Sequence, residues 1–234
     1  MRARPRSSVC PPGAAWLLAG LVLAAVGGRD AHAQTADTLS TDARLFYAVY
    51  RLDGPVLGTY LHAVDATAYP VFFGAPAAAW AGAALFRDDG DYEDAYRLTV
   101  TWGLASAAAV GLKRLFRRPR PYAALPGVTP RGRPPSDPFS FPSGHATLAF
   151  AMAASWSLSH PKWYVVAPAA VWAGSVALSR MWLGVHYPGD VLAGALLGTG
   201  AAVLVHLVGP SITPGFLKGE DRRPPSMIVV LIRF

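Results

Sequence analysis

The sequence has a single cysteine and unusually few charged residues. Cys10 stands alone, which excludes a disulfide framework and a metal site built from cysteines. Charged residues make up 15% of the 234 positions, against roughly 25% in ordinary soluble domains. With 53% hydrophobic residues, the chain is too apolar to be disordered and too poor in charge for an ordinary water-soluble globule.

Signatures of nucleic-acid binding are also missing, although the net charge is +7. The sequence contains neither zinc-finger spacing nor an RNA-binding aromatic motif. Much of the positive charge lies in residues 113–133, which contain no acidic residue. A concentrated basic patch beside apolar segments is typical of a site for a phosphate group or an anionic lipid headgroup, so we expect no nucleic-acid partner. The basic residues of this stretch are Lys113, Arg114, Arg117, Arg118, Arg120, Arg131 and Arg133.

Residues 1–33 have the form of a secretory signal peptide. The chain opens with a basic stretch, continues with a short apolar run over 14–28, and reaches a small-x-small cleavage pattern at Ala31-His32-Ala33. The alternative is an uncleaved anchor helix, because Arg29 and Asp30 lie unusually close to the cleavage site.

Uncharged runs dominate the rest of the chain. The segment 34–65 mixes polar and apolar positions, and apolar residues at helical spacing predict an amphipathic helix near 42–52. Beyond it we expect membrane spans near 66–86, 98–116, 144–161, 163–179 and 191–209.

The predicted fold is therefore an all-α, membrane-embedded helical bundle over 66–209. It has five spans after a signal peptide, or six if the first helix is uncleaved, and a C-terminal tail follows over 210–234. A soluble bundle of buried helices would show similar apolar runs and stays open as an alternative.

Three short clusters carry the chemically active side chains: residues 113–121, 142–145 and 179–190. The first follows the second predicted span and the second opens the third span. The last cluster bridges the fourth and fifth spans. Because successive spans run in opposite directions, all three clusters are expected at one face of the membrane.

The predicted convergence would create a phosphate site. Lys113, Arg120 and Arg180 supply cations, and arginine offers a planar fork that suits phosphate oxygens. Ser143 is a good helix N-cap, and Gly144 lets the backbone approach an anion. The free N–H groups of a helix N-terminus favour the same ligand.

Two histidines in such a site suggest a nucleophile and a general acid. His145 opens the third span, and His186 precedes Asp190 by four residues. The Asp190 carboxylate can accept the proton of one ring nitrogen of His186, which fixes the tautomer and leaves the other nitrogen free to attack.

The three clusters resemble the motifs of the type 2 phosphatidic acid phosphatase superfamily, which also includes vanadium haloperoxidases. Those motifs are K-x6-RP, PSGH and SR-x5-H-x3-D. The chain reads KRLFRRPRP at 113–121, PSGH at 142–145 and SRMWLGVHYPGD at 179–190, so all eleven fixed residues match in order and spacing. The resemblance covers residues 66–209.

The resemblance implies a role for each motif residue. His186 is the nucleophile that forms a phosphohistidine, Asp190 activates it, and His145 protonates the leaving oxygen. The phosphate ligands implied by the same resemblance are Lys113, Arg120, Ser143, Gly144 and Arg180. Arg114, Arg117 and Arg118 occupy variable positions of the first motif. They either contact a second phosphate or an anionic lipid, or are ordinary arginines of the membrane interface.

The expected function is hydrolysis of a lipid phosphate or diphosphate at the extracytoplasmic face of a bacterial inner membrane. The expected partners are the phosphorylated lipid and membrane lipids, and neither a metal nor another cofactor is required, because cations and histidines supply the chemistry. Three rivals are a soluble periplasmic acid phosphatase, a vanadate-dependent haloperoxidase and a non-catalytic membrane protein. The lipid stays open among undecaprenyl diphosphate, phosphatidylglycerol phosphate, phosphatidic acid and a lipid A phosphate.

Overall fold

A computed structural model describes residues 39–86 and 91–217, and in these ranges the chain is helical and forms no β-strand. The predicted signal peptide over 1–33 and the end of the C-terminal tail lie outside the described residues. The all-α prediction is confirmed for the described part. Its elements are α2 (Thr41–Tyr50), α3 (Pro55–Phe86), α4 (Asp91–Phe116), α5 (Pro121–Ala124), α6 (Gly144–Ser159), α7 (Trp163–Trp182), α8 (Pro188–Ile212) and the short 3-10 helix η2 (Gly215–Leu217).

Local sequence signals explain several helix ends. Ser40 caps α2, where its side chain accepts the Ala43 N–H, and Ser143 caps α6 by accepting the Ala146 N–H. The helix predicted near 42–52 is confirmed as α2. Helix α4 ends at Phe116, shortly before Pro119, because the residue before a proline avoids the helical region.

Five long helices, α3, α4, α6, α7 and α8, lie at the five predicted spans. Among the described residues, α3, α7 and α8 are long and apolar enough to cross a membrane. Helix α6 has only 16 residues, and α4 carries acidic residues in its first turn. The number of spans therefore stays a prediction.

Helix α3 is longer than its uncharged run suggests. It begins at Pro55 and continues through Pro70 and Pro76 to Phe86. The predicted span began at residue 66 because Asp65 ends the uncharged stretch. In the fold Asp65 lies inside the helix and is paired with Arg180 of α7.

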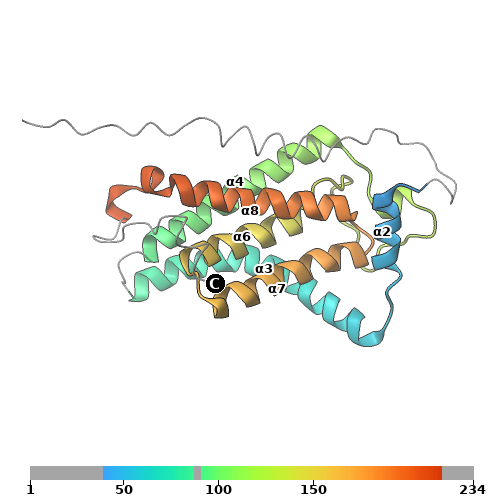
Figure 1. The fold of residues 1–234 in the computed structure, drawn as a ribbon, viewed down its shortest axis with the longest axis horizontal. Helices are drawn as coiled ribbons and strands as arrows, with labels where there is room; N and C mark the ends of the chain where they lie inside the picture. Colours follow the sequence, from blue (N-terminus) through green and yellow to red (C-terminus); the bar gives the residue numbers. More distant parts are fainter. Residues whose placement is uncertain (1–38, 87–90, 218–234) are drawn as a thin grey trace, which may run out of the picture. The chain divides into compact units, whose positions relative to one another are not determined.

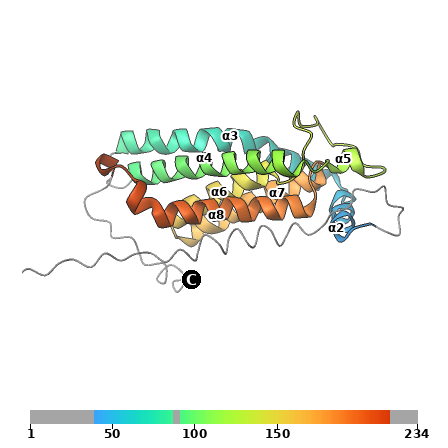
Figure 2. The same ribbon diagram turned by 90° about the horizontal axis from the view of Figure 1, so that it is seen from above.

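Helix α6 lies at the centre of the bundle and packs against α8, α7 and α4 (Figures 1 and 2). Glycines make the contact with α8 unusually close. A Cβ atom on Gly194 would lie 2.7 Å from the Ser143 carbonyl oxygen, and one on Gly198 would overlap the Thr147 carbonyl oxygen. This close approach fixes the start of α6, with Ser143 and His145, against the second and third turns of α8.

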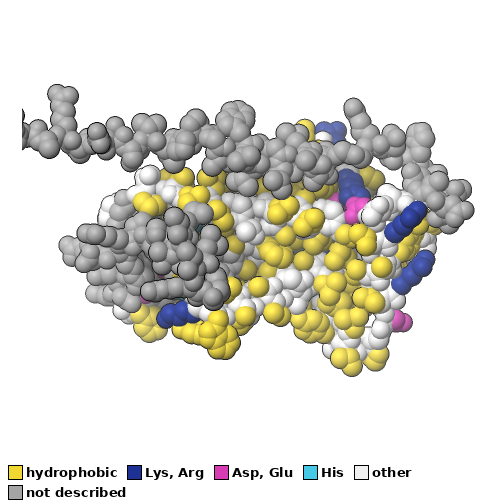
Figure 3. All heavy atoms as spheres, in the orientation of Figure 1, with side chains coloured by type: hydrophobic (Ala, Val, Ile, Leu, Met, Phe, Trp, Pro, Cys, Tyr) yellow, Lys and Arg dark blue, Asp and Glu magenta, His cyan; other side chains and the backbone are white. Residues whose placement is uncertain are grey.

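Apolar side chains cover much of the described surface on the face shown in Figure 3, and many large apolar side chains are exposed. Exposed members come from α3, α4, α7 and α8, as in a helix bundle that faces lipid rather than water. Examples are Phe73, Leu85, Val171, Leu192 and Leu207.

Candidate active site

The three sequence clusters meet at one end of the bundle. The C-terminal ends of α4 and α7 lie there beside the N-terminal ends of α6 and α8, together with α2 and α5 (Figure 2). The Ser143 N–H donates to the Asp190 carbonyl at 2.9 Å, which joins the second cluster to the third. The predicted convergence is thus observed, and we call this region the motif end.

His186 lies in the turn between α7 and α8 and is almost fully buried, with 2% of its surface exposed. Its Nε2 atom is 3.1 Å from the Nη1 atom of Arg120. A guanidinium group can only donate hydrogen bonds, so Nε2 is the acceptor in this contact and carries no proton. A neutral His186 ring then holds its proton on Nδ1.

The Nδ1 atom of His186 faces Asp190 at 3.6 Å from Oδ2, slightly beyond hydrogen-bond distance. The carboxylate is held elsewhere: Oδ2 accepts the Tyr187 N–H at 2.9 Å, and Oδ1 accepts a hydrogen bond from Arg118 at 2.8 Å. Asp190 is adjacent to the histidine, as predicted, but its closest bonds anchor it to the start of α8.

Burial strongly lowers the pKa of His186, and the positive charges of Arg120, Arg180 and Lys113 lower it further. The imidazole therefore stays neutral in mildly acidic solution. A neutral ring with a free Nε2 lone pair is the protonation state that a nucleophilic histidine needs.

Two of the predicted phosphate ligands contact one aspartate in the loop before α6. Lys113 Nζ lies 3.2 Å from Asp137 Oδ2 and donates to the Phe139 carbonyl at 2.8 Å. Arg120 Nη2 lies 3.8 Å from the same Asp137 oxygen. The Phe139 N–H and Lys113 lower the pKa of Asp137 despite its partial burial, so this carboxylate is ionised and balances both cations.

Arg180 lies in the last turn of α7, and its guanidinium is largely buried. Its Nη1 atom pairs with Asp65 of α3, whereas its Nε atom is buried without a hydrogen-bond partner. A buried charged donor without a partner is costly, and a ligand oxygen would satisfy it. This orphaned donor is the observation in the structure that most directly fits an anion at the motif end.

The start of α6 supplies the remaining predicted residues. Ser143 is fully buried as the N-cap, and Gly144 begins the helix with nothing within 4 Å of an added Cβ. The ring of His145 packs edge-on against Tyr69 and Phe72 of α3. His145 is also within electrostatic range of Arg180, Arg120 and His186, so the second histidine shares the charged site.

Two residues of the motif end have contacts that the sequence did not predict. Arg118, whose role the sequence left open, pairs with Asp190 and with Asp42 of α2 and so belongs to the charged network of the motif end. Arg114 and Arg117, in contrast, are exposed. Asp42 carries no local signal, because its role depends on contacts far along the chain.

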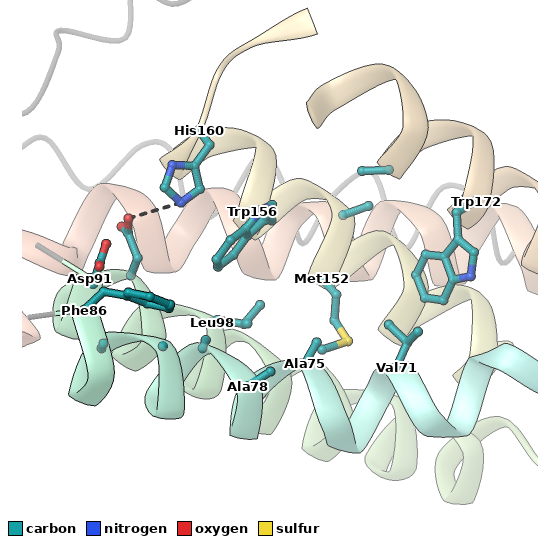
Figure 4. Close-up of a pocket in the computed structure, with 16 residues that line it drawn as sticks. Val71, Ala75, Ala78, Phe86, Asp91, Leu98, Met152, Trp156, His160 and Trp172 are labelled. Atoms are coloured by element: carbon teal, nitrogen blue, oxygen red, sulfur yellow. Dashed lines mark ion pairs between the residues drawn. The ribbon is translucent and has the colours of Figure 1, made fainter. Parts of the chain in front are cut away.

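An apolar cavity lies away from the motif residues, between α3, α4, α6 and α7 (Figure 4). Its volume is about 550 Å³, and Met152, Trp156 and Trp172 line it. At its far end, His160 Nε2 lies 3.5 Å from Asp94 Oδ2. No group of three residues suited to hold a metal ion occurs within the described ranges.

Comparisons with known proteins identify relatives of this architecture. A family model described as the PAP2 superfamily matches residues 94–213, about half of the chain. The chain is 41% identical over 98 residues to "Bacitracin transport permease protein BcrC" of Bacillus licheniformis, covering 40% of this chain and 45% of that protein. It is 41% identical over 108 residues to a "Decaprenylphosphoryl-5-phosphoribose phosphatase" of Mycobacterium tuberculosis, covering 45% and 56%. The chain thus spans about half the length of these curated relatives.

A solved structure shares the fold. It is the first transmembrane PAP2 type phosphatidylglycerolphosphate phosphatase from Bacillus subtilis, with a TM-score of 0.60 and 23% sequence identity, over 86% of this chain and 96% of that one. At this identity the likeness concerns the arrangement of helices.

Proposed function

Because the chain belongs to the PAP2 superfamily, we propose that it is a membrane phosphatase that hydrolyses a lipid phosphate or diphosphate through a phosphohistidine. The observation that carries this proposal is the setting of His186. Its unprotonated Nε2 lies among cations that can hold a phosphoryl group, and its Nδ1 faces a buried carboxylate.

In the first step, Nε2 of His186 attacks phosphorus and forms an N–P bond while the bond to the leaving oxygen breaks. The negative charge of the bound phosphate offsets the neighbouring cations and keeps His145 protonated in the complex. His145 then gives its proton to the leaving oxygen, which departs as a lipid alcohol or, from a diphosphate, as a lipid phosphate. Asp190 stabilises the positive charge that develops on the His186 ring.

In the second step, water attacks the phosphohistidine. His145, now neutral, takes the proton of the water, the N–P bond breaks, and inorganic phosphate leaves. His186 returns to its neutral form and His145 to its protonated form, so the cycle balances without a further reactant.

Lys113, Arg120 and Arg180 are proposed to stabilise the transferring phosphoryl group. The buried Nε atom of Arg180 is available for a phosphate oxygen, and Arg120 can move its hydrogen bond from His186 to the same group. Ser143 and the N-terminal amides of α6 are proposed to complete the phosphate site. These groups supply the positive charge for the reaction, so we propose that no metal is needed.

The exposed apolar faces of α3, α7 and α8 support a multi-pass membrane protein. With a cleaved signal peptide and five spans, the motif end would face the periplasm and the C-terminus the cytoplasm. The basic residues of the tail, Lys218, Arg222 and Arg223, fit a cytoplasmic C-terminus. The phosphatase names of the relatives support a lipid-linked phosphate as the substrate.

The test is phosphate release by detergent-purified protein from undecaprenyl diphosphate, phosphatidylglycerol phosphate, phosphatidic acid and a lipid A phosphate. We expect release from at least one lipid, unchanged by EDTA and inhibited by orthovanadate, which can adopt the trigonal-bipyramidal shape of the transition state. Activity that returns only with added Mg²⁺ would contradict the metal-free mechanism. Recovery of active protein without detergent would favour the soluble phosphatase.

A further inference from the structure

Arg118 connects three elements at the motif end. Its Nη1 atom donates to Asp190 Oδ1 at 2.8 Å, and its Nη2 atom donates to Asp42 Oδ2 at 2.6 Å. Its guanidinium carbon lies 3.8 Å from the centre of the Tyr187 ring. Both terminal nitrogens are thus engaged by carboxylates, which leaves Arg118 poorly placed to bind a second phosphate.

Asp42 makes a second contact with the same region. Its Oδ1 atom accepts the Gly189 N–H at 2.7 Å, in the first turn of α8. A carboxylate at a helix N-terminus is stabilised by the free amides and the helix dipole. Helix α2 is therefore joined to the start of α8 both directly and through Arg118.

These contacts determine how Asp190 is presented to His186. The Asp190 side chain is fully buried, and a buried carboxylate is stable only when it is paired and hydrogen-bonded. Arg118 supplies the positive charge and occupies Oδ1. The other oxygen, Oδ2, is held by the Tyr187 N–H on the side that faces His186 Nδ1.

We infer that Arg118 and Asp42 are positioning residues for the catalytic histidine: Asp42 holds Arg118, and Arg118 holds Asp190 as an ionised, oriented partner of His186. The inference rests on the proposed phosphatase function. It gives α2 a role beyond lying at the membrane interface, because this helix completes the support of the nucleophile. The effect falls on the rate of phosphoryl transfer rather than on substrate binding.

The experiment compares kcat and KM of detergent-purified full-length variants with p-nitrophenyl phosphate as the probe. For Arg118→Gln we expect kcat to fall about 10- to 100-fold, with KM changed by less than about twofold. This range is typical for loss of a residue that does not touch the substrate but orients a side chain of the site. Asp42→Asn keeps an oxygen for Gly189 but loses its charge, and a smaller fall in kcat of the same kind is expected. Arg114→Gln, which removes an exposed arginine of the same motif, is the matched control and should behave like wild type.

A double variant tests whether the two residues act in series. If Asp42 acts through Arg118, Asp42→Asn combined with Arg118→Gln should be no slower than Arg118→Gln alone. Wild-type kcat in Arg118→Gln, or a raised KM with unchanged kcat, would overturn the inference, and the raised KM would assign Arg118 to phosphate binding. If Arg118→Gln does not fold, Asp42→Asn tests the inference in its place: a lowered kcat with unchanged KM supports it, and wild-type kcat overturns it.

The outcomes separate this inference from the proposed function. If wild-type protein releases no phosphate from any substrate, the proposed function fails. If wild type is active and both single variants keep its kcat, only the positioning role fails.

Discussion

The two ends of the helix bundle contain different kinds of buried side chain. At the motif end, buried charges dominate, and each pairs with a partner from another element. At the opposite end, a cavity of about 550 Å³ is lined mainly by apolar side chains, with Asp94 and His160 at its edge. A histidine and an aspartate occur at both ends, but among the described residues several cations surround the histidine at the motif end alone.

This difference shows that a His–Asp pair alone does not define a phosphatase site. At the motif end, aspartates from α2, α3 and the loop before α6 balance the cations, and none of them belongs to the three motifs. They keep the cations in place, and a substrate phosphate must compete with some of them. The pairs are Arg118 with Asp42 and Asp190, Lys113 and Arg120 with Asp137, and Arg180 with Asp65.

The largest expected effect separates the two histidine–aspartate pairs. His186→Ala should lower kcat by at least about 10⁴-fold, because loss of a nucleophile removes the covalent route. His160→Ala at the opposite end should change kcat by less than about threefold. Phosphate release from the best lipid substrate measures both, and comparable losses would show that the comparison of the two ends is wrong.

A second variant distinguishes the two histidines within the motif end. His145→Ala should slow hydrolysis of a lipid alcohol phosphate about 10²- to 10⁴-fold, the usual contribution of a general acid. Nitrophenyl phosphate has a stable leaving anion and should lose much less rate. Equal losses on both substrates would contradict the assignment of His145 as the acid.

The close packing of α8 on α6 connects the two ends of the bundle, and a single substitution can weaken it. Gly198→Ala places a Cβ against the backbone of α6 and should destabilise the fold by about 1–3 kcal/mol. Gly200→Ala, where nothing lies within 4 Å of an added Cβ, is the matched control. Thermal unfolding in detergent measures both, and an unchanged midpoint in Gly198→Ala would argue against this packing.

The pH dependence should reflect the charged surroundings of His186. Since burial and the nearby cations lower its pKa, the ring stays neutral below pH 6.5, and protonation at lower pH removes the nucleophile. The acid limb of kcat/KM should therefore lie below about pH 6.5, the ordinary histidine value, after correction for ionisation of the substrate. A limb at or above that value would show that the cations do not act on His186.

The smallest effect concerns the competition between a carboxylate and the substrate. Asp137→Asn keeps an oxygen for the Phe139 N–H but removes a negative charge beside Lys113 and Arg120. Orthovanadate should then bind a few-fold more tightly, because exposed or half-exposed ion pairs contribute at most about 1 kcal/mol. Weaker inhibition would indicate that Asp137 organises the site rather than competing for it.

Sequence patterns predicted the helices and the meeting of the motifs well, for a physical reason. Long apolar runs are local signals, and alternation of helix direction determines which helix ends share a face. The match of His145, His186 and Asp190 in spacing then pointed to the chemistry. The start of α3 was missed because Asp65 interrupts the apolar run, although its pairing with Arg180 lets the helix continue through it.

The balancing aspartates could not be predicted in the same way. Asp42 lies in a short amphipathic segment, far along the chain from Arg118 and Gly189. Which carboxylate reaches which cation depends on how α2 packs on the bundle, and no local pattern carries that information. The role of Arg118 stayed open for the same reason, since its partners come from two distant elements.

The central claim is that His186 carries the phosphoryl group during turnover. Quench-flow with nitrophenyl phosphate, followed by detection of acid-labile phosphate on the protein, tests it most directly. We predict trapped phosphate on His186 in wild type and in His160→Ala, and none in His186→Ala. Trapped phosphate in His186→Ala, or turnover of wild type without any covalent phosphate, would contradict the account.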